Sequence, residues 1–502
     1  MLQDGILGES LRDAAVGSVP IEDDAFPALI APANVEEFFA QTWQREPRVF
    51  CAREGGGSSP SCPAEAHRRP IAPQTWADCL DMLTLAWGAS PVQPPDGCDF
   101  LVFKGRQLSQ AYEWSGPCSA LLDGASCVVN HAEFVWPPFA KLCKELRARL
   151  LHVYCNSYVT PPVSQAVPPH ADDRDVFVLQ ILGRKRWRVY GSPPIKLPYT
   201  DEQVGKHGLA IPDSVLNSPP VIEYDLKPGD VLYMPRGFVH EACCPDETSS
   251  WHATLAVATH DWSWTKVFAS TIAEAMDTEP SARWREAVPL ALGRGPERPG
   301  AAGAEAAAEA ELERLADFVR QTVSVPLLRK RILAKLESHN GIQTEAASSF
   351  LAELSRCLRE DPSDVPLHWQ TCFVREATRV RQPSREEEAE LEARMKGMGK
   401  GKCKAKGKGR GSLAIRPEVL GAAASAVREL ERRREAGMLV REFAEAAPAA
   451  ADLGPFDELT QLCLARVGVA AGVLQVVPSE PGSGSSAHAD REVHRNRVTA
   501  CC

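Results

Sequence analysis

The chain has 502 residues, of which 44% are hydrophobic and 24% are charged, and its formal net charge is −10. This length allows two or three domains, and the composition is ordinary for a soluble globular protein. The negative charge argues against a protein that coats nucleic acid with its whole surface. No basic stretch followed by an apolar core opens the sequence, and no apolar run approaches membrane-spanning length, so we expect neither a secretory signal nor a membrane partner.

The 16 cysteines are scattered along the chain and form no Cys-x-x-Cys pair. A zinc ribbon and a thioredoxin-like site are therefore not supported. With no secretory signal expected, we interpret the cysteines as free thiols in a reducing compartment.

The first expected helix comes after residues 1–30, which we predict to be disordered. Asn34-Val35-Glu36-Glu37 is typical of a capped helix start. Apolar residues then repeat at helical spacing, namely Val35, Phe38, Phe39 and Trp43. A second such series predicts a helix that leads into a strand carrying Asn156 and Tyr158. Its members are Phe139, Leu142, Cys143, Leu146 and Leu150.

A possible metal site begins at His170 and Asp172, which one small residue separates. Alternate side chains of a strand point to the same face, so both can face the interior of a barrel. Taken alone, a His-x-Asp sequence is common by chance. A metal site therefore needs a further ligand from elsewhere in the chain.

Two further strands are expected after this pair. Residues 176–182 form a β-branched and aromatic run of strand length, and Gly183 permits a turn. The alternation in 185–190 predicts a strand whose one face carries Lys185, Trp187 and Val189. Arginines crowd the same stretch, so a solvated Lys185 is the alternative to an inward one.

A second histidine, His240, ends a string with several turn signals. Pro228-Gly229-Asp230 is typical of a turn, residues 231–234 read as a short strand, and Pro235 ends it. Glycine, five residues, proline, four residues and histidine is the second-motif spacing of cupin barrels. A lone buried histidine is more often a hydrogen-bonded core residue, but here order, spacing and turns agree with His170 and Asp172. Two imidazoles and one carboxylate on one side of a metal leave the opposite positions open, as in non-haem Fe(II) oxygenases.

The sequence resembles the JmjC-type 2-oxoglutarate oxygenases, in particular the ribosomal oxygenase branch of bifunctional lysine-specific demethylases and histidyl-hydroxylases. The resemblance covers roughly residues 30–290. It rests on stretches 156–162, 169–173, 177–190 and 229–240, and upstream on Phe38-Phe39, Trp43 and Glu46-Pro47-Arg48.

The resemblance implies that His170, Asp172 and His240 hold Fe(II), with no catalytic side chain beyond the metal centre. It further implies that Lys185 pairs with the distal carboxylate of 2-oxoglutarate and that Asn156 and Tyr158 line the same pocket. A buried dicarboxylate needs a fixed cation, which supports the role of the lysine. Where many members carry a hydroxyl residue, this chain has Ala256, and Thr254 is the candidate replacement.

The C-terminal third differs in composition. Residues 266–276 and 302–336 are rich in helix formers, and the resemblance implies that such helices form a homodimer interface; a helical lid on one monomer is the alternative. The lysine- and glycine-rich run 396–410 is expected to be disordered. Its role is interpreted as an RNA contact, a nuclear import signal or a plain linker. Helices followed by a strand near 473–477 suit the winged-helix module of the family.

The expected fold class is α+β, a cupin-like double-stranded β-helix with supporting helices. The predicted parts are a disordered N-terminus (1–30), the JmjC barrel (31–265), a helical dimerisation region (266–380), a charged linker (381–412), a winged-helix-like module (413–478) and a disordered tail (479–502).

The predicted function is an Fe(II)-, 2-oxoglutarate- and O₂-dependent protein oxygenase that hydroxylates a histidine of a ribosomal protein. The alternatives are a histone lysine demethylase, a catalytically lapsed cupin scaffold and, less favoured, a zinc-holding cupin isomerase. The family resemblance implies a nuclear, in particular nucleolar, location, with the cytoplasm as the alternative.

Overall fold

The computed structural model describes residues 24–52, 70–88, 92–110, 113–165, 167–206, 208–244, 248–281, 283–293, 299–357, 374–384, 430, 432, 438–443, 457–471 and 473–477. The chain divides into a barrel unit, Met1–Val257 with Gln343–Cys502, and a helical unit, Ala258–Ile342. The predictions for residues 1–23, 385–429 and 478–502, which include the basic run 396–410, lie outside the described residues. No helix in the described ranges is both long enough and apolar enough to cross a membrane.

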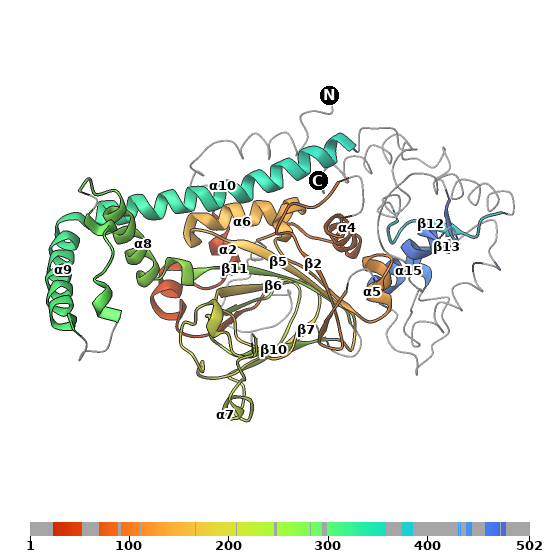
Figure 1. The fold of residues 1–502 in the computed structure, drawn as a ribbon. Helices are drawn as coiled ribbons and strands as arrows, with labels where there is room; N and C mark the ends of the chain where they lie inside the picture. Colours follow the sequence, from red (N-terminus) through yellow and green to blue (C-terminus); the bar gives the residue numbers. More distant parts are fainter. Residues whose placement is uncertain are drawn as a thin grey trace. The chain divides into compact units, whose positions relative to one another are not determined.

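The barrel unit is built on an antiparallel sheet of eight strands (Figure 1). Their spatial order is β1 (Arg48–Phe50), β9 (Val231–Met234), β6 (Asp175–Gly183), β11 (Ser250–Val257), β5 (Tyr154–Thr160), β4 (Ser126–Val129), β2 (Phe100–Lys104) and β3 (Gln107–Ser109). The order places strands that are distant in sequence beside one another, as in a double-stranded β-helix. The predicted strands at 176–182 and 231–234 are confirmed as β6 and β9.

A second antiparallel sheet closes the barrel. It consists of β10 (His240–Cys243), β7 (Lys185–Val189) and β8 (Ile222–Leu226). Side chains of the two sheets meet in the interior, where the rings of Trp187 on β7 and His252 on β11 lie 5.5 Å apart. Burial alternates along β7, with Lys185, Trp187 and Val189 buried, so the inward orientation predicted for Lys185 is confirmed.

The tight connection from β6 to β7 requires a glycine. Gly183 has φ +65°, and a Cβ on it would lie 1.8 Å from the carbonyl oxygen of Ser249. Any other residue would therefore push Ser249 and the start of β11 away from this turn.

Helices cover the outer face of the large sheet. They are α2 (Phe26–Leu29), α3 (Val35–Glu37) continued by a π-helical turn (Phe38–Thr42), α4 (Trp76–Ala86), α5 (Pro117–Leu122) and α6 (Pro137–Leu150). Short helical turns lie at Ala132–Phe134 and Thr200–Glu202, and α7 is Asp213–Leu216. The helix predicted at 139–150 is confirmed as α6, whose Phe139 packs on Trp251 of β11 with ring centroids 6.1 Å apart.

An aromatic cluster joins the first helices to β6. Phe177 contacts the rings of Phe26, Phe38 and Trp43 at centroid distances between 5.8 and 6.4 Å. The expectation of disorder through residue 30 needs correction, because Phe26 is fully buried in this cluster. Burial of an aromatic ring outweighs the low helix signal of so short a segment.

The last described segments of the barrel unit form a small sheet and one helix. β12 (Arg379–Arg381) lies between β13 (Met438–Leu439) and β14 (Gln475–Val476), next to the turn Val440–Glu442 and α15 (Glu458–Ala470). The predicted helix around Leu459 and Leu462 is confirmed as α15.

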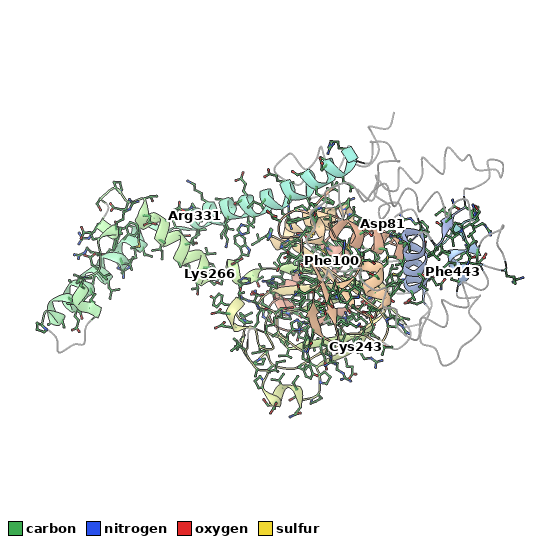
Figure 2. The ribbon with its side chains drawn as sticks, turned by 45° about the vertical axis from the view of Figure 1, so that its right-hand side comes forward. Asp81, Phe100, Cys243, Lys266, Arg331 and Phe443 are labelled. Atoms are coloured by element: carbon green, nitrogen blue, oxygen red, sulfur yellow. The ribbon has the colours of Figure 1, made fainter. Side chains whose placement is uncertain are left out.

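A buried ion-pair cluster attaches this region to α4. Asp81, labelled in Figure 2, pairs with Arg466 of α15 at 2.8 Å and with Arg375 at 2.7 Å. Arg466 is 1% exposed and Asp81 is 5% exposed. Arg375 also lies 3.9 Å from a second carboxylate, that of Asp78, so loss of Asp81 chiefly removes the anion that pairs with the buried charge of Arg466.

We therefore expect Asp81→Asn to destabilise the barrel unit by roughly 3–5 kcal/mol. The measurement is thermal unfolding of the full chain. Glu223→Gln, which breaks an exposed pair with Arg188, serves as the control and should cost less than about 1 kcal/mol. Equal unfolding temperatures for the two variants would contradict this role for Asp81.

The helical unit contains α8 (Trp264–Asp277), α9 (Ala301–Thr322) and the first part of α10 (Val325–Cys357). The predicted helical stretch 266–276 is confirmed, and the stretch 302–336 is helical but divided between α9 and α10 at residues 323–324. Short turns lie at Thr259–Trp262, Arg283–Arg285 and Leu290–Gly293. Within it, Trp284 contacts Phe318 with ring centroids 5.5 Å apart, and Arg283 pairs with Glu311 at 2.8 Å.

Candidate metal centre

The two histidines of the predicted site face each other across an isolated antiparallel bridge. The backbone N–H of His170 donates to the carbonyl of His240 at 3.1 Å, and the N–H of His240 donates back at 2.9 Å. This reciprocal pair extends the small sheet beyond β10. It brings the rings of two distant segments to a centroid distance of 4.5 Å.

Asp172 completes the group on the same side. Its Oδ1 lies 3.6 Å from Nε2 of His170, and its Oδ2 lies 3.7 Å from Nε2 of His240. One potential ligand atom from each of the three residues lies within 4.8 Å of the others. In the described part of the chain this is the one group of three or more such side chains that could hold a metal ion.

Both imidazoles are oriented by their other ring nitrogen. Nδ1 of His170 lies 2.7 Å from the carbonyl of Pro168, and Nδ1 of His240 lies 3.1 Å from the carbonyl of Phe238. A carbonyl oxygen can only accept, so each Nδ1 carries the proton. The lone pair of each Nε2 is therefore free to bind a metal, with the tautomer fixed by the backbone.

The loop before His240 depends on Gly237. Its φ is +94°, and a Cβ there would lie 2.5 Å from the carbonyl oxygen of Ile195. The N–H of Gly237 donates to the carbonyl of Asp172 at 2.9 Å. A side chain at this position would thus disturb the aspartate ligand and the loop that leads to the second histidine.

The electrostatics of the group favour metal binding. Burial lowers the pKa of His170 to about 3, helped by the positive charge of Lys206 and by His240. Burial also lowers the pKa of His240. Burial alone would raise the pKa of Asp172, but Lys206 and the two histidines lower it well below its usual range. At neutral pH the site therefore presents two neutral imidazoles and a carboxylate, the protonation states that a metal requires.

Lys206 is a residue of this site that the sequence did not reveal. Its Nζ lies 2.6 Å from Oδ1 of Asp172 and 3.2 Å from Oε1 of Gln203. It comes from an irregular loop, where no periodicity relates it to the barrel interior. Its ammonium and a metal ion would compete for the same carboxylate oxygen.

Deeper in the barrel, Lys185 is a buried cation that no carboxylate among the described residues neutralises. Its side chain is 3% exposed, and its Nζ donates to Oγ1 of Thr160 at 3.1 Å. Burial lowers its pKa, since the charged form loses its hydration. A buried ammonium with one hydroxyl partner is suited to an anionic ligand.

The remaining predicted pocket residues lie on inward faces of β5 and β11. Tyr158 stacks on His252 with centroids 4.8 Å apart and planes 3° apart, and it shares a side-chain hydrogen bond with Asn156. Thr254 lies opposite Asn156 in the β5–β11 register. Ala256 lies two residues farther along the same face, opposite Tyr154.

His252 was missed at the sequence level, although its spacing to Thr254 places both on one strand face. Its ring is 1% exposed, and its Nδ1 has no partner among the described residues. Burial lowers its pKa well below the usual value, and the nearby charge of Lys185 acts in the same direction. The alternation of side chains along β11, with a period of two, was the signal that could have predicted the inward position of His252.

The residues around this site belong to a known domain. The family model described as JmjC domain matches residues 129–265, which span β5 to β11 and include all three candidate ligands. This segment therefore matches the JmjC domain, and the JmjC and cupin-like part of the expected fold is confirmed.

The resemblance to the ribosomal oxygenase branch is also confirmed. The chain is 36% identical over 239 residues to Ribosomal oxygenase 1 of Homo sapiens, covering 46% of this chain and 34% of the relative. It is 30% identical over 244 residues to the bifunctional lysine-specific demethylase and histidyl-hydroxylase NO66 of Drosophila persimilis, covering 48% and 32%. The matched segment thus spans about a third of these curated relatives. Among solved structures, a ribosomal oxygenase YcfD of Escherichia coli in complex with cobalt and 2-oxoglutarate is similar over 61% of this chain and 71% of its own, with 20% identity and a TM-score of 0.37.

We expect Lys206→Met to raise the affinity of the site for Co²⁺, because the ammonium no longer competes for Asp172. The gain should be about two- to fivefold, the worth of a partly exposed ion pair. Calorimetric titration of metal-free protein measures it. His170→Ala should abolish binding and Lys227→Met, an exposed lysine elsewhere on the barrel, should change nothing; weaker binding by Lys206→Met would contradict the competition.

Proposed function

We propose that this protein is an Fe(II)- and 2-oxoglutarate-dependent protein oxygenase. The observation that carries the proposal is the convergence of His170, Asp172 and His240 in a JmjC domain. The buried and otherwise unneutralised Lys185 supports it, because the same barrel then offers a metal site and a cation for the co-substrate. Two nitrogen ligands and one oxygen ligand suit iron in this setting.

Each residue has a defined part in this proposal. His170, Asp172 and His240 would hold the iron, and Lys185 with Thr160 would bind the distal carboxylate of 2-oxoglutarate. Asn156, Tyr158 and Thr254 would line the co-substrate pocket, with the Thr254 hydroxyl substituting for the one that Ala256 lacks. Iron with 2-oxoglutarate and O₂ supplies oxidation of an unactivated C–H bond, with release of succinate and CO₂. The barrel contributes fixed ligands and a site shielded from water.

The proposed substrate is a ribosomal protein, hydroxylated on a histidine side chain. Relatives that carry the name Ribosomal oxygenase 1 support this choice. The alternative is a methylated histone lysine, whose hydroxylated N-methyl group would leave as formaldehyde. The full name of NO66, which includes both activities, is the reason to keep it.

The test of the function is succinate release from 2-oxoglutarate with iron and ascorbate, together with mass spectrometry of ribosomal proteins. His170→Ala should abolish both succinate and the added oxygen atom. Succinate release by that variant at the rate of the unaltered protein would show that the metal centre is not the source. Purified protein that neither holds nor regains an iron-group metal would favour the scaffold alternative.

Lys185→Met should raise the KM for 2-oxoglutarate by at least about 30-fold. The loss of one partner of a buried charge pair costs about 2 kcal/mol or more, which corresponds to that factor. The matched control is Arg184→Met, an exposed cation one residue away. An unchanged KM in the Lys185 variant would remove this residue from the co-substrate pocket.

We also propose that the chain forms a homodimer through the helical unit. Several of its large apolar side chains are more than half exposed, namely Trp264, Val288, Leu290, Leu312, Val325, Leu333 and Ile342. A surface with so many exposed apolar groups is typical of an interface, and a two-fold dimer is the commonest way to cover one.

Replacing both Leu290 and Leu312 by aspartate should convert the dimer to a monomer. The physical reason is that two charges would have to be buried in the interface. Light scattering after size-exclusion chromatography measures the mass. Leu108→Asp, which alters an apolar side chain 58% exposed on the barrel unit, is the control and should leave the dimer intact. A monomeric parent protein would contradict the proposal outright.

Two further roles concern the C-terminal part. We propose that the winged-helix-like module predicted at 413–478 comprises β13, β14 and α15, with β12 added from before the predicted linker, and that it packs on the barrel, as the Asp81 cluster supports. The basic run 396–410 is proposed to bind RNA and to direct the chain to the nucleus and nucleolus. Salt-sensitive RNA binding that survives deletion of this run would exclude it as the contact.

A further inference from the structure

A separate cavity of about 360 Å³ lies on the barrel unit, beside the loop that leads to His240. Its walls come from residues 191–197, which come after β7, from 235–238, and from Gln44 and Arg45 after the first helices. Three of its lining residues are cationic, namely Arg45, Lys196 and Arg236. All ten lining residues lie in the described part of the chain, and none of them carries a carboxylate.

Arg236 is the buried cation of this cavity. Only 5% of the residue is exposed, and its Nη1 donates to the carbonyl of Pro198 at 3.2 Å. Its Nε is buried and has no acceptor among the described residues. Because Nε is closed to solvent, a ligand in the cavity would respond to the charge of Arg236, and an acceptor for Nε would have to come from the protein itself.

The nearby acids do not supply it, because they already have other partners. Asp175 accepts from the hydroxyl of Tyr233 at 2.9 Å and from Nε2 of Gln44 at 3.2 Å. Asp173 accepts from Nη2 of Arg174 at 3.1 Å and from Oγ1 of Thr200 at 2.7 Å. Arg236 forms no direct ion pair within the described residues, although the charges of Asp175 and Asp173 act on it and oppose the effect of burial, which lowers its pKa.

The two exposed cations add to this charge. Nη1 of Arg45 donates to the carbonyl of Ala40, and this bond leaves its charge without a carboxylate partner among the described residues. Lys196 is exposed and forms no ion pair with any described residue. The cavity thus combines one buried guanidinium with two cations open to solvent.

The cavity shares its wall with the metal centre. Phe238 lines the cavity, and its carbonyl accepts the hydrogen bond from Nδ1 of His240. Gly237, in the same loop, donates to the carbonyl of Asp172. A ligand in the cavity would therefore contact the loop that orients two of the three candidate metal ligands.

We propose that this cavity binds a carboxylate of the polypeptide substrate, in the segment next to the residue that is oxidised. The positive charges of Arg45, Lys196 and Arg236 attract a carboxylate, and the lining of Pro193, Leu197 and Phe238 suits the short aliphatic stem that carries one. A phosphodiester of RNA would bring no such apolar stem. The identity of the occupant as substrate rests on the proposed function, whereas the carboxylate site itself does not.

The test measures peptide binding to the full chain by calorimetry, without iron or 2-oxoglutarate. The first probe is an acetylated and amidated pentapeptide Gly-Glu-Glu-Glu-Gly, and the second has glutamine in place of glutamate. A third probe has the glutamines and a free C-terminal carboxylate. Comparison of the three shows whether a side-chain or a terminal carboxylate is bound.

Lys196→Glu should weaken binding of the preferred carboxylate peptide at least about tenfold, since it replaces an attractive charge by a repulsive one. Arg236→Met should weaken it similarly, and thermal unfolding shows whether that buried variant is folded. Lys196 is exposed, so its variant tests the site even if Arg236→Met does not fold. Lys227→Glu changes the net charge equally at a distant exposed site and should leave binding unchanged.

Equal binding of the glutamate and glutamine peptides, with no gain from the free C-terminus, would overturn the proposal. So would tenfold tighter binding of a ten-nucleotide single-stranded RNA that Lys196→Glu abolishes, because the site would then select phosphodiesters. Succinate release is measured separately. Its absence would refute the proposed oxygenase, while carboxylate binding that depends on Lys196 would still establish this site.

Discussion

The structure depends on the backbone bridge between His170 and His240. Two reciprocal hydrogen bonds join segments that are distant in sequence, and each segment brings one imidazole to the same point. Because the bridge belongs to the main chain, the backbone positions of the two histidines do not rely on side-chain contacts. The carbonyls of Pro168 and Phe238 then fix the rings, so the site is arranged before any metal arrives.

The interior of the barrel is divided by charge. Near the bridge lies a carboxylate that the two imidazoles and Lys206 stabilise. Elsewhere in the interior lies a buried cation, Lys185, which donates to the hydroxyl of Thr160 and lies over the ring of Trp187 but forms no ion pair with a carboxylate of the described residues. A molecule with a metal-binding end and a distal carboxylate would satisfy both positions at once. This complementarity, rather than any single residue, is the strongest physical support for 2-oxoglutarate.

Much of this arrangement could be predicted from local sequence rules. The period of two along β7 placed Lys185 inward, and the spacing of glycine, proline and histidine identified the loop before His240. The rules failed where structure is irregular or set by distant contacts. Lys206 lies in a loop without periodicity, and Phe26 is held by aromatic rings from elsewhere in the chain. No local pattern indicates the burial of Arg236, because that burial depends on the loop 191–198, whose Pro198 carbonyl accepts from it.

The ion pairs of Asp81 have a consequence for synthesis of the chain. The aspartate lies on an early helix, whereas Arg375 and Arg466 come some three hundred and four hundred residues later. During translation the carboxylate leaves the ribosome long before either arginine exists. Until then, the surface on which α15 will pack is uncovered, and the nascent barrel carries an anion that its final environment has not yet enclosed. The barrel unit therefore completes the Asp81 ion pairs only when α15 emerges.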